Sequence, residues 1–339
     1  MFKAFQFSAL LAFSVVLTPV FSVSVRAEEE AELSFAIIGD LPYGVKKGEH
    51  DADFENLVHQ LNTDSSLAWV VHVGDIKSGR SSCSNDFLSD RKTRLGKINI
   101  PLVYTPGDNE WTDCHTIFTG SHNSLERLSK LRELFFLDDR AEADRNILGV
   151  TQQSQAQSEH KTFIENYSWF RHGVQFISLH MVGSANGKAK YSALSAIRRT
   201  EKHDQEVTAR EQAALDWLDY GFAQAKKNNA EAVFLITHAN TGLARWPDKK
   251  IKAPFQFFNT ALAKHVEKFP APVVLAHGDS HYARIDSPKI DGRKHSKKFL
   301  RLESFGENNN AWIKVTINPS TPNIFSFTFY DGITPLKND

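Results

Sequence analysis

The stretch Trp69-Val70-Val71-His72-Val73-Gly74-Asp75 carries the pattern that decides the fold. It is a short apolar run, rich in β-branched residues, that ends directly in a glycine and an acid. A run that is continuous rather than alternating predicts a strand buried on both faces. Similar short runs recur along the chain at Phe35–Gly39, Leu102–Thr105, Val174–Leu179, Ala232–Ile236 and Val273–Ala276.

Helical patterns lie between several of these runs. Apolar residues at three-to-four spacing predict helices over Phe54–Leu61 and Leu125–Leu134. The longest predicted helix runs from about Thr208 to Asn229, with Thr208 as its N-cap and Glu211 completing a capping box. Strands that alternate with helices in this way predict an α/β fold with a largely parallel sheet.

The C-terminal section has a different pattern. Ala311–Ile317 and Ile324–Tyr330 alternate between apolar and polar residues, which predicts an antiparallel hairpin. Parallel units followed by late antiparallel strands predict two packed mixed β-sheets flanked by helices. The polar segment at residues 138–161 is rich in glutamine and serine and predicts a long loop or lid within a single domain that spans residues 28–339.

Residues 1–27 have the pattern of a secretory signal peptide. Lys3 precedes an apolar run from about Phe5 to Val25, and Val25-Arg26-Ala27 offers small residues at a cleavage site. The alternative is a membrane anchor, since the run approaches the roughly 20 residues that span a bilayer. The acidic residues that follow favour cleavage, which predicts a periplasmic or secreted protein with no membrane span in its mature chain.

The net charge bears on the class of partner, and the cysteine content bears on disulfide bonding. The chain has 40 lysine and arginine residues and 40 aspartate and glutamate residues, so its formal net charge is zero. This balance gives no indication of a nucleic-acid partner. The two cysteines, Cys83 and Cys114, are an even pair in a chain predicted to be exported, and they follow strands expected to end at one edge. We therefore expect them to form a disulfide.

Acidic residues and histidines follow the ends of the predicted strands. A single Gly-Asp pair is ordinary turn chemistry, but here the pattern recurs at successive strand ends. In a parallel sheet these ends share one edge, where ligands bind. Carboxylates gathered there would repel one another unless a cation lies among them, so the pattern predicts a metal site. The candidate ligands are Asp40, Asp75, Asp108, His238, Asp279 and His281.

The order of these motifs, from about Ser34 to Tyr330, resembles that of the calcineurin-like metallophosphoesterases. The resemblance implies a four-layer α/β/β/α fold and hydrolysis of a small phosphoester by two metal ions that hold a bridging hydroxide. It implies that Asp40 and His281 bind the first ion and that Asp75 bridges both ions. The remaining implied ligands, of the second ion, are Asp108, His238 and Asp279.

The chain departs from the family pattern, which marks a variant branch. Pro42 stands where the family often has a ligating histidine, and Asp108 and Asp279 replace neutral ligands. The extra carboxylates favour Mn, Fe or other hard divalent or trivalent ions. Asn109 replaces the family's catalytic histidine and can donate a hydrogen bond to a phosphoryl oxygen but no proton. His115 is the nearest candidate acid, although it also fits a surface loop.

Two other functions remain open at this stage. The chain could be a binding protein that kept the fold and lost the chemistry, or a metallohydrolase that acts on non-phosphoryl substrates. Further residues have a structural interpretation beside a functional one. His72 is expected to be a core histidine. His180 and the loop around Asn186 follow a predicted strand, where they would either touch substrate or form a plain turn. Tyr43 lies near a position where some branches place a metal-binding residue.

Overall fold

The computed structural model describes Met1 and residues 32–44, 50–191, 193–243, 253–294, 298–307, 310–332 and 334–335. Apart from Met1, the predicted signal peptide at residues 1–27 lies outside the described residues. Among the described helices, none is both long enough and apolar enough to cross a membrane.

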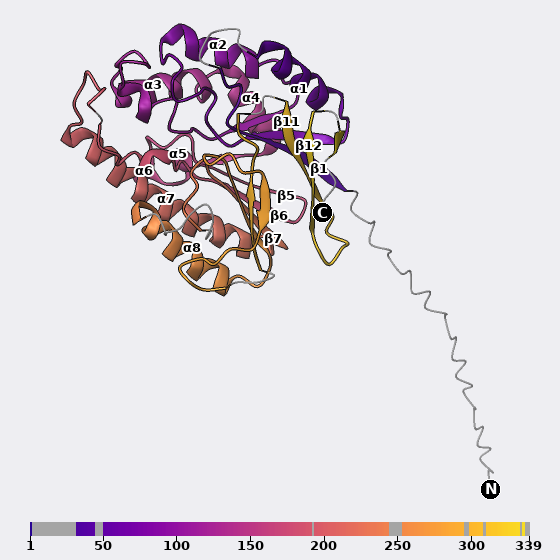
Figure 1. Cartoon of the computed structure of the whole chain (residues 1–339). Coiled ribbons are helices and arrows are strands. Elements are labelled where there is room, and N and C mark those ends of the chain that lie inside the picture. The colour runs from indigo at the N-terminus through magenta and orange to yellow at the C-terminus, as the bar shows by residue number, and fades with distance from the viewer. Residues whose placement is uncertain are drawn as a thin grey trace.

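Two β-sheets form the centre of the protein (Figure 1). The first has the order β13-β12-β11-β1-β2-β3, with bounds β1 Leu33–Ile38, β2 Leu67–His72, β3 Leu102–Tyr104, β11 Ala311–Ile317, β12 Phe325–Asp331 and β13 Thr334–Pro335. The second has the order β4-β5-β6-β7-β8-β10-β9, with bounds β4 Thr151–Gln152, β5 Tyr167–Arg171, β6 Val174–Ser178, β7 Ala232–Ile236, β8 Val273–His277, β9 Arg284–Asp286 and β10 Phe299–Glu303.

Both sheets have a parallel centre with antiparallel edges. In the first sheet β1, β2 and β3 are parallel, and the hairpin β11–β12 joins them antiparallel to β1. In the second sheet β6, β7, β8 and β10 are parallel, and β5 and β9 are antiparallel to their neighbours. The predicted fold class of two packed mixed sheets flanked by helices is therefore confirmed.

Helices cover the outer faces of the two sheets. The α-helices of the described residues are α1 Asp51–Thr63, α2 Asn85–Leu95, α3 Ser124–Phe135, α4 Asp139–Leu148, α5 Gln153–Ala156, α6 Gly183–Asn186, α7 Glu201–Lys227 and α8 Gln256–Lys268. Short 3-10 helices cover Thr112–His115, Ser158–His160 and Ala253–Phe255. Helices α1 to α4 lie on one side of the sheets and α7 and α8 on the other (Figure 1).

Aromatic side chains pack the two sheets together. Phe35 on β1 lies edge-on to Phe176 of β6 and Phe234 of β7, with ring centroids 5.6 and 5.2 Å apart. Trp69 on β2 contacts Trp169 of β5 in the same way, at 6.4 Å. All five rings are buried, and edge-on pairs add about 0.5–1.5 kcal/mol each to the gain from burial. These aromatic contacts between the sheets determine how the strand ends of one sheet face those of the other.

Two details of the helical prediction are wrong. Helix α7 begins at Glu201 rather than near Thr208, and its N-cap is Thr200, whose backbone N–H donates to His203 Nδ1 at 3.1 Å. The helix start could not be predicted from apolar spacing, because the helical residues before Val207 are polar. Residues 138–161 are not a long loop, since they contain α4, β4 and α5. Helix α4 is polar because only Asp144 and Leu148 are buried in it.

A buried ion pair joins α3 to the second sheet. Arg132 donates to both carboxylate oxygens of Glu165, at 2.6 and 3.0 Å, and His180 Nδ1 lies 2.7 Å from the same side chain. Burial would raise the pKa of Glu165, but Arg132 and His180 outweigh it and hold that pKa far below its usual range. Glu165 therefore stabilises the fold above its unfolded-state pKa of about 4.3, and this contribution is lost as the pH falls further.

We expect Glu165→Gln to lower the free energy of unfolding by about 3 kcal/mol at neutral pH, since it leaves Arg132 without its carboxylate. Below pH ~4.3 the variant should lose less stability than the wild type for each unit of pH. Urea unfolding at pH 7, 4 and 3 measures both effects, with Glu159→Gln, an exposed site, as the control. Equal pH dependence in the variant and the wild type would show that folding does not lower the pKa of Glu165.

Candidate metal centre

The candidate ligands follow five strands that belong to both sheets. Asp40, Asp75 and Asp108 follow β1, β2 and β3 of the first sheet. His238 follows β7 of the second sheet, and Asp279 and His281 follow β8. The side chains thus gather where the carboxyl ends of two sheets meet, rather than along one sheet edge as predicted.

Among the residues that the structure describes, two groups of three side chains could hold a metal ion. They are Asp40, Asp75 and His238, and Asp108, His238 and Asp279, and within each group the ligand atoms lie within 4.8 Å of one another. All of these residues are buried except Asp279, which is partly exposed. His238 belongs to both groups, so the two groups are contiguous.

His238 is oriented by the backbone behind it. Its Nδ1 lies 2.8 Å from the carbonyl oxygen of Val73, which makes Nδ1 the donor and turns Nε2 toward the carboxylates. Nε2 lies 3.0 Å from Asp108 Oδ1 and 3.4 Å from Asp75 Oδ1. A backbone partner on one ring nitrogen is the usual support of a histidine that ligates metal through the other.

Asp75 has contacts on both of its oxygens. Its Oδ2 accepts from Tyr43 Oη at 3.0 Å and from Asn109 Nδ2 at 2.5 Å. Its Oδ1 accepts from the backbone N–H of Asn109 at 3.0 Å and faces His238. These bonds hold the carboxylate between the two ends of the cluster, where the resemblance predicts a bridging ligand.

His281 and Asp40 form the other end of the cluster. His281 Nε2 lies 3.3 Å from Asp40 Oδ1 and 3.5 Å from Tyr43 Oη. Asp40 also accepts from the backbone N–H of Asp279 at 3.2 Å. The structure thus brings all six candidate ligands together, and it adds Tyr43 beside them.

The backbone is constrained at four of these residues. Asp40, Asp75, Asp279 and His281 have φ values of 55, 56, 73 and 62 degrees, in the left-handed region. Residues other than glycine adopt this region seldom and at a cost of about 1–3 kcal/mol, and such residues cluster at functional sites. The surrounding fold therefore imposes these conformations, and they aim the side chains into the cluster.

Glycines next to the ligands leave room for other ligands. A Cβ placed on Gly107 would overlap Asp75 Oδ1, and one on Gly278 would overlap Asp40 Oδ2. A Cβ on Gly183 would lie 2.5 Å from Asp108 Oδ1 and 2.6 Å from Asp279 Oδ1. In two of the four Gly-Asp pairs, at Gly107 and Gly278, the glycine thus makes space for the aspartate of another motif.

The charges of the cluster are poorly balanced in the protein alone. Burial raises the pKa of the Asp75 carboxyl well above its usual range, and the charges of Asp108 and Asp40 add to this while His238 opposes it. Burial would lower the pKa of His238, but Asp75 and Asp108 outweigh it and raise that pKa well above its usual range. Even two imidazolium groups, at His238 and His281, cannot neutralise four neighbouring aspartates, so a cationic partner would relieve the repulsion.

The donor set fits metal ions. Carboxylate oxygens and imidazole nitrogens suit Mn, Fe and Zn, and an oxygen-rich set favours the harder ions. The buried position and the backbone support of His238 are typical of built ligand sites. A cavity of about 530 Å³ opens over the cluster, with Asp75, Asp108, Asn109, Asp279 and His281 in its wall. Tyr43, Arg80 and Glu307 also line it.

Asn109 is held in place from several sides. Its carbonyl oxygen accepts from Lys77 Nζ at 2.8 Å, and both sulfur atoms of the Cys83–Cys114 disulfide lie 3.6 Å from it. Burial lowers the pKa of Lys77 to about 8, although nearby carboxylates oppose this. The predicted disulfide is confirmed, with Cα atoms 5.7 Å apart, and it joins the segments that follow β2 and β3.

We expect the double variant Cys83→Ala/Cys114→Ala to lose about 3 kcal/mol of unfolding free energy, because the disulfide closes a loop of 31 residues. Since the sulfur atoms contact the carbonyl of Asn109, metal binding at the cluster should weaken as well. Urea unfolding and metal titration, each measured with and without reductant, would test this. Reductant should lower the unfolding free energy of the wild type and leave that of the double variant unchanged. If reductant did not change the unfolding free energy of the wild type, the expectation would be contradicted.

Three histidines singled out in the sequence lie outside the cluster. His115 does not line the cavity over the cluster; it stacks on Tyr191, with ring centroids 3.7 Å apart, and lines a separate small cavity. His72 is fully buried, with Nε2 2.8 Å from the carbonyl oxygen of Leu41. His180 is bound to Glu165. The structural interpretation therefore fits His72 and His180.

Some supporting residues gave no clear signal in the sequence. The backbone N–H of Asn240 donates to Asp279 Oδ2 at 2.9 Å, and its side chain donates to Ser280 Oγ at 2.6 Å. Ser280 in turn donates to the buried Glu303 at the end of β10. Asn240 lies two residues after His238, a spacing that could have marked it, whereas Glu303 could be found only from the fold.

Comparison with known proteins found distant similarity in structure only. No family model matches the chain, and no curated protein matches it. A purple acid phosphatase PPD1 from yellow lupin (Lupinus luteus) shares 11% identity at a TM-score of 0.46, covering 89% of this chain and 52% of that one. The NAD nucleotidase NadN of Haemophilus influenzae shares 14% identity at a TM-score of 0.41, covering 88% and 49%. The chain spans about half the length of either protein, and similarity of this size assigns no activity to it.

Proposed function

We propose that this protein is an exported, metal-dependent phosphoesterase that acts on small phosphate esters with two metal ions. The observation that carries the proposal is the convergence of four aspartates and two histidines from five strand ends of two sheets. The motif order resembles that of calcineurin-like metallophosphoesterases, which supports the same reaction class. The Cys83–Cys114 disulfide supports an oxidising location, either the periplasm or outside the cell.

The proposed ligand assignment is the one that the resemblance implies. Asp40 and His281 would hold one ion, and Asp75 would be shared. Asp108, His238 and Asp279 would hold the second. When bound, two such ions would polarise a phosphoryl oxygen and lower the pKa of water. Asp75 is the group suited to be shared, because its carboxylate lies between His238 and the Tyr43 side of the cluster.

The other residues of the site would bind and orient the substrate. Asn109 Nδ2 and Tyr43 Oη both lie at the cavity wall and donate to Asp75, and the Asn109 amide also donates to Tyr43 Oη. The Asn109 amide would turn from these partners to donate a hydrogen bond to an ester oxygen of the substrate. Burial, followed by the charge of Asp75, raises the pKa of Tyr43 well above its usual range, so its hydroxyl stays protonated. Arg80, at the rim of the cavity, offers a positive charge to an anionic substrate. His115 has no part in this arrangement.

We expect Mn- or Fe-loaded protein to be more active than Zn-loaded protein. Asp108 and Asp279 bring the cluster to four carboxylates, whose charge equals that of two divalent ions. Little positive charge remains to attract phosphate, and one charge at 4 Å is worth about 4 kcal/mol at an effective dielectric near 20. Harder ions suit this oxygen-rich set, and diesters carry less negative charge than monoesters. We therefore also expect diester turnover at least equal to monoester turnover.

The test is turnover of bis(p-nitrophenyl) phosphate and p-nitrophenyl phosphate by metal-free protein reloaded with Mn, Fe or Zn. Hydrolysis that depends on added metal would support the proposal. Bound metal without turnover of either ester would favour one of the two alternatives. Turnover of a carboxylic ester such as p-nitrophenyl acetate, not inhibited by phosphate, would then identify a non-phosphoryl hydrolase, and its absence would favour a binding protein. A Zn-loaded protein that strongly prefers the monoester would show that the charge argument is wrong.

A further inference from the structure

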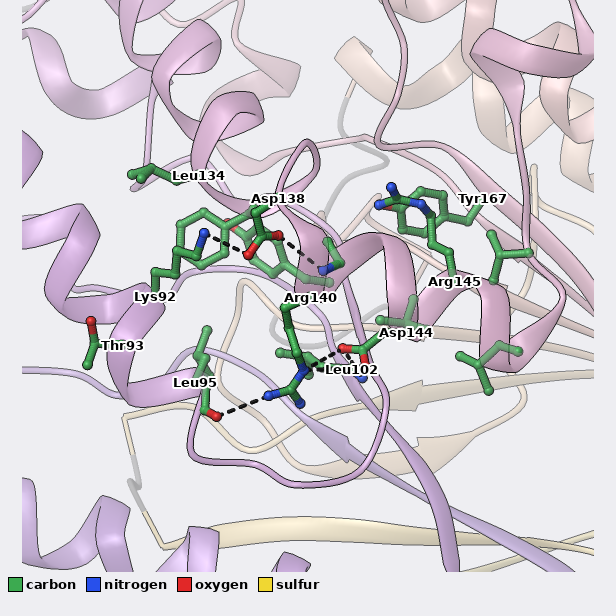
Figure 2. Close-up of a pocket in the computed structure, with 17 residues that line it drawn as sticks. Lys92, Thr93, Leu95, Leu102, Leu134, Asp138, Arg140, Asp144, Arg145 and Tyr167 are labelled. Atoms are coloured by element: carbon green, nitrogen blue, oxygen red, sulfur yellow. Dashed lines mark hydrogen bonds and ion pairs between the residues drawn. The ribbon is translucent and has the colours of Figure 1, made fainter.

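A second cavity lies beside β3, away from the candidate metal centre. Its volume is about 350 Å³. Its walls come from β3, from the last turns of α2 and α3, and from α4 (Figure 2). It shares no lining residue with the cavity over the metal cluster.

The cavity exists because polar side chains hold α4 against the sheet. β3 is an edge strand, and α4 covers its open edge. Asp144 accepts from the backbone N–H of Leu102 at 3.2 Å, and Arg140 donates to the carbonyl oxygens of Gly96 and Ile100 at 3.1 and 3.2 Å. These contacts fix the helix through long side chains rather than by close apolar packing, so space remains between the helix and the strand.

The wall of this space is mostly apolar. Its side chains include Leu95, Val103, Tyr104, Phe135, Leu148 and Tyr167. The apolar part of this wall offers water no polar partners, so a ligand with an apolar body would displace poorly held water there. A concave apolar site with a few polar groups is typical of small-molecule binding sites.

The cationic side chains that line the cavity outnumber the carboxylates by one. Lys92 pairs with Asp138 at 2.7 Å, and Arg140 pairs with Asp144 at 3.1 Å (Figure 2). Arg145 has a different environment: its Nη1 donates to the carbonyl oxygen of Phe136 at 3.0 Å, and its guanidinium lies beside the ring of Tyr167. Within the described part of the chain, no carboxylate pairs with Arg145. The five charged side chains of the wall therefore sum to one positive charge.

We propose that this cavity binds a small anionic amphiphile, with its apolar body between β3 and α4 and its anionic head at Arg145. The apolar walls account for the body, and the guanidinium, which forms strong charge-assisted hydrogen bonds with oxyanions, accounts for the head. The inference does not depend on the proposed phosphoesterase activity, because the two cavities have no lining residue in common.

The test uses two fluorescent probes with the same ring system. 8-Anilinonaphthalene-1-sulfonate carries an anionic sulfonate group, and N-phenyl-1-naphthylamine lacks it and is neutral. The wild-type protein should bind the sulfonate at one saturable site, about tenfold more tightly than the neutral probe, as expected for one charge-assisted contact. Arg145→Gln should weaken the sulfonate about tenfold and leave the neutral probe unchanged. Arg293→Gln, at an exposed arginine, is the matched control and should change neither.

A second variant fills the space itself. Ala141 lies in the cavity wall on α4, and Ala141→Trp should abolish binding of both probes. Thermal unfolding of each variant shows whether it is folded. If Ala141→Trp does not fold, the affinities of both probes for the wild type and for Arg145→Gln still test the proposal. Equal affinity for the two probes, no saturable binding, or sulfonate binding that survives Arg145→Gln would each overturn the proposal.

Discussion

Replacing Asp75 with alanine is expected to remove both metal ions and to lower phosphoester turnover by more than about a hundredfold. Loss of a hydrogen-bond partner behind a metal ligand alone costs about 10–100-fold, and a shared ligand should cost more. Asp75 contacts Tyr43, Asn109 and His238, so its removal affects both ends of the cluster. Replacement of Asp40 or Asp108 should affect mainly one ion.

Metal analysis of the purified variants would measure this effect. Asp219→Ala is a matched control, because Asp219 lies on α7 with 73% of its side chain exposed. It should keep the metal content and turnover of the wild type. Full metal occupancy in folded Asp75→Ala protein would refute the assignment of the shared ligand.

Adding one methyl group at Gly107 is expected to weaken metal binding by displacing Asp75. The backbone of Gly107 is not left-handed, so alanine meets no backbone strain there. Its Cβ, however, would overlap both Asp75 Oδ1 and the backbone nitrogen of Asp75. Gly107→Ala should therefore displace Asp75 and lower metal affinity and turnover by at least about tenfold, as when the support of a ligand is lost.

The control for this variant separates backbone strain from steric overlap. Gly149, at the C-cap of α4, has a φ of 68 degrees and no atom within 4 Å of a Cβ placed on it. Gly149→Ala should cost about 1 kcal/mol of stability through its left-handed backbone and leave metal binding unchanged. Metal titration and unfolding curves of both variants would separate the effect of steric overlap on metal affinity from the effect of backbone strain on stability. Wild-type metal affinity in Gly107→Ala would mean that Asp75 is not held where the account requires.

The sequence was sufficient to predict most of the central strands. It missed β10 Phe299–Glu303, whose buried residues include the charged Arg301 and Glu303. The bounds of β7 and β11 match the predicted runs residue for residue, because buried strands are continuous apolar runs and a hairpin strand alternates. The edge strands β4, β9 and β13 were missed because they have only two or three residues. Strand β5 was also missed, since its run Tyr167–Arg171 mixes buried aromatic with exposed residues.

The candidate ligands were predictable because each follows a strand that is itself predictable. Their division between two sheets was not, since it depends on which strands pair, and that is a long-range property. For the same reason Gly183 could not be placed beside Asp108 and Asp279, nor Tyr43 beside Asp75. The sequence placed His115 near Glu110 along the chain, but the 3-10 helix that ends at His115 turns its ring to Tyr191.

The most direct test of the central claim is anomalous diffraction at the Mn edge from crystals of Mn-loaded protein. We predict two anomalous peaks in the cluster, about 3.5–4 Å apart. One should lie between Asp40, Asp75 and His281, and the other among Asp75, Asp108, His238 and Asp279. Peaks confined to other parts of the molecule, or no peak among these side chains at full Mn occupancy in solution, would contradict the account.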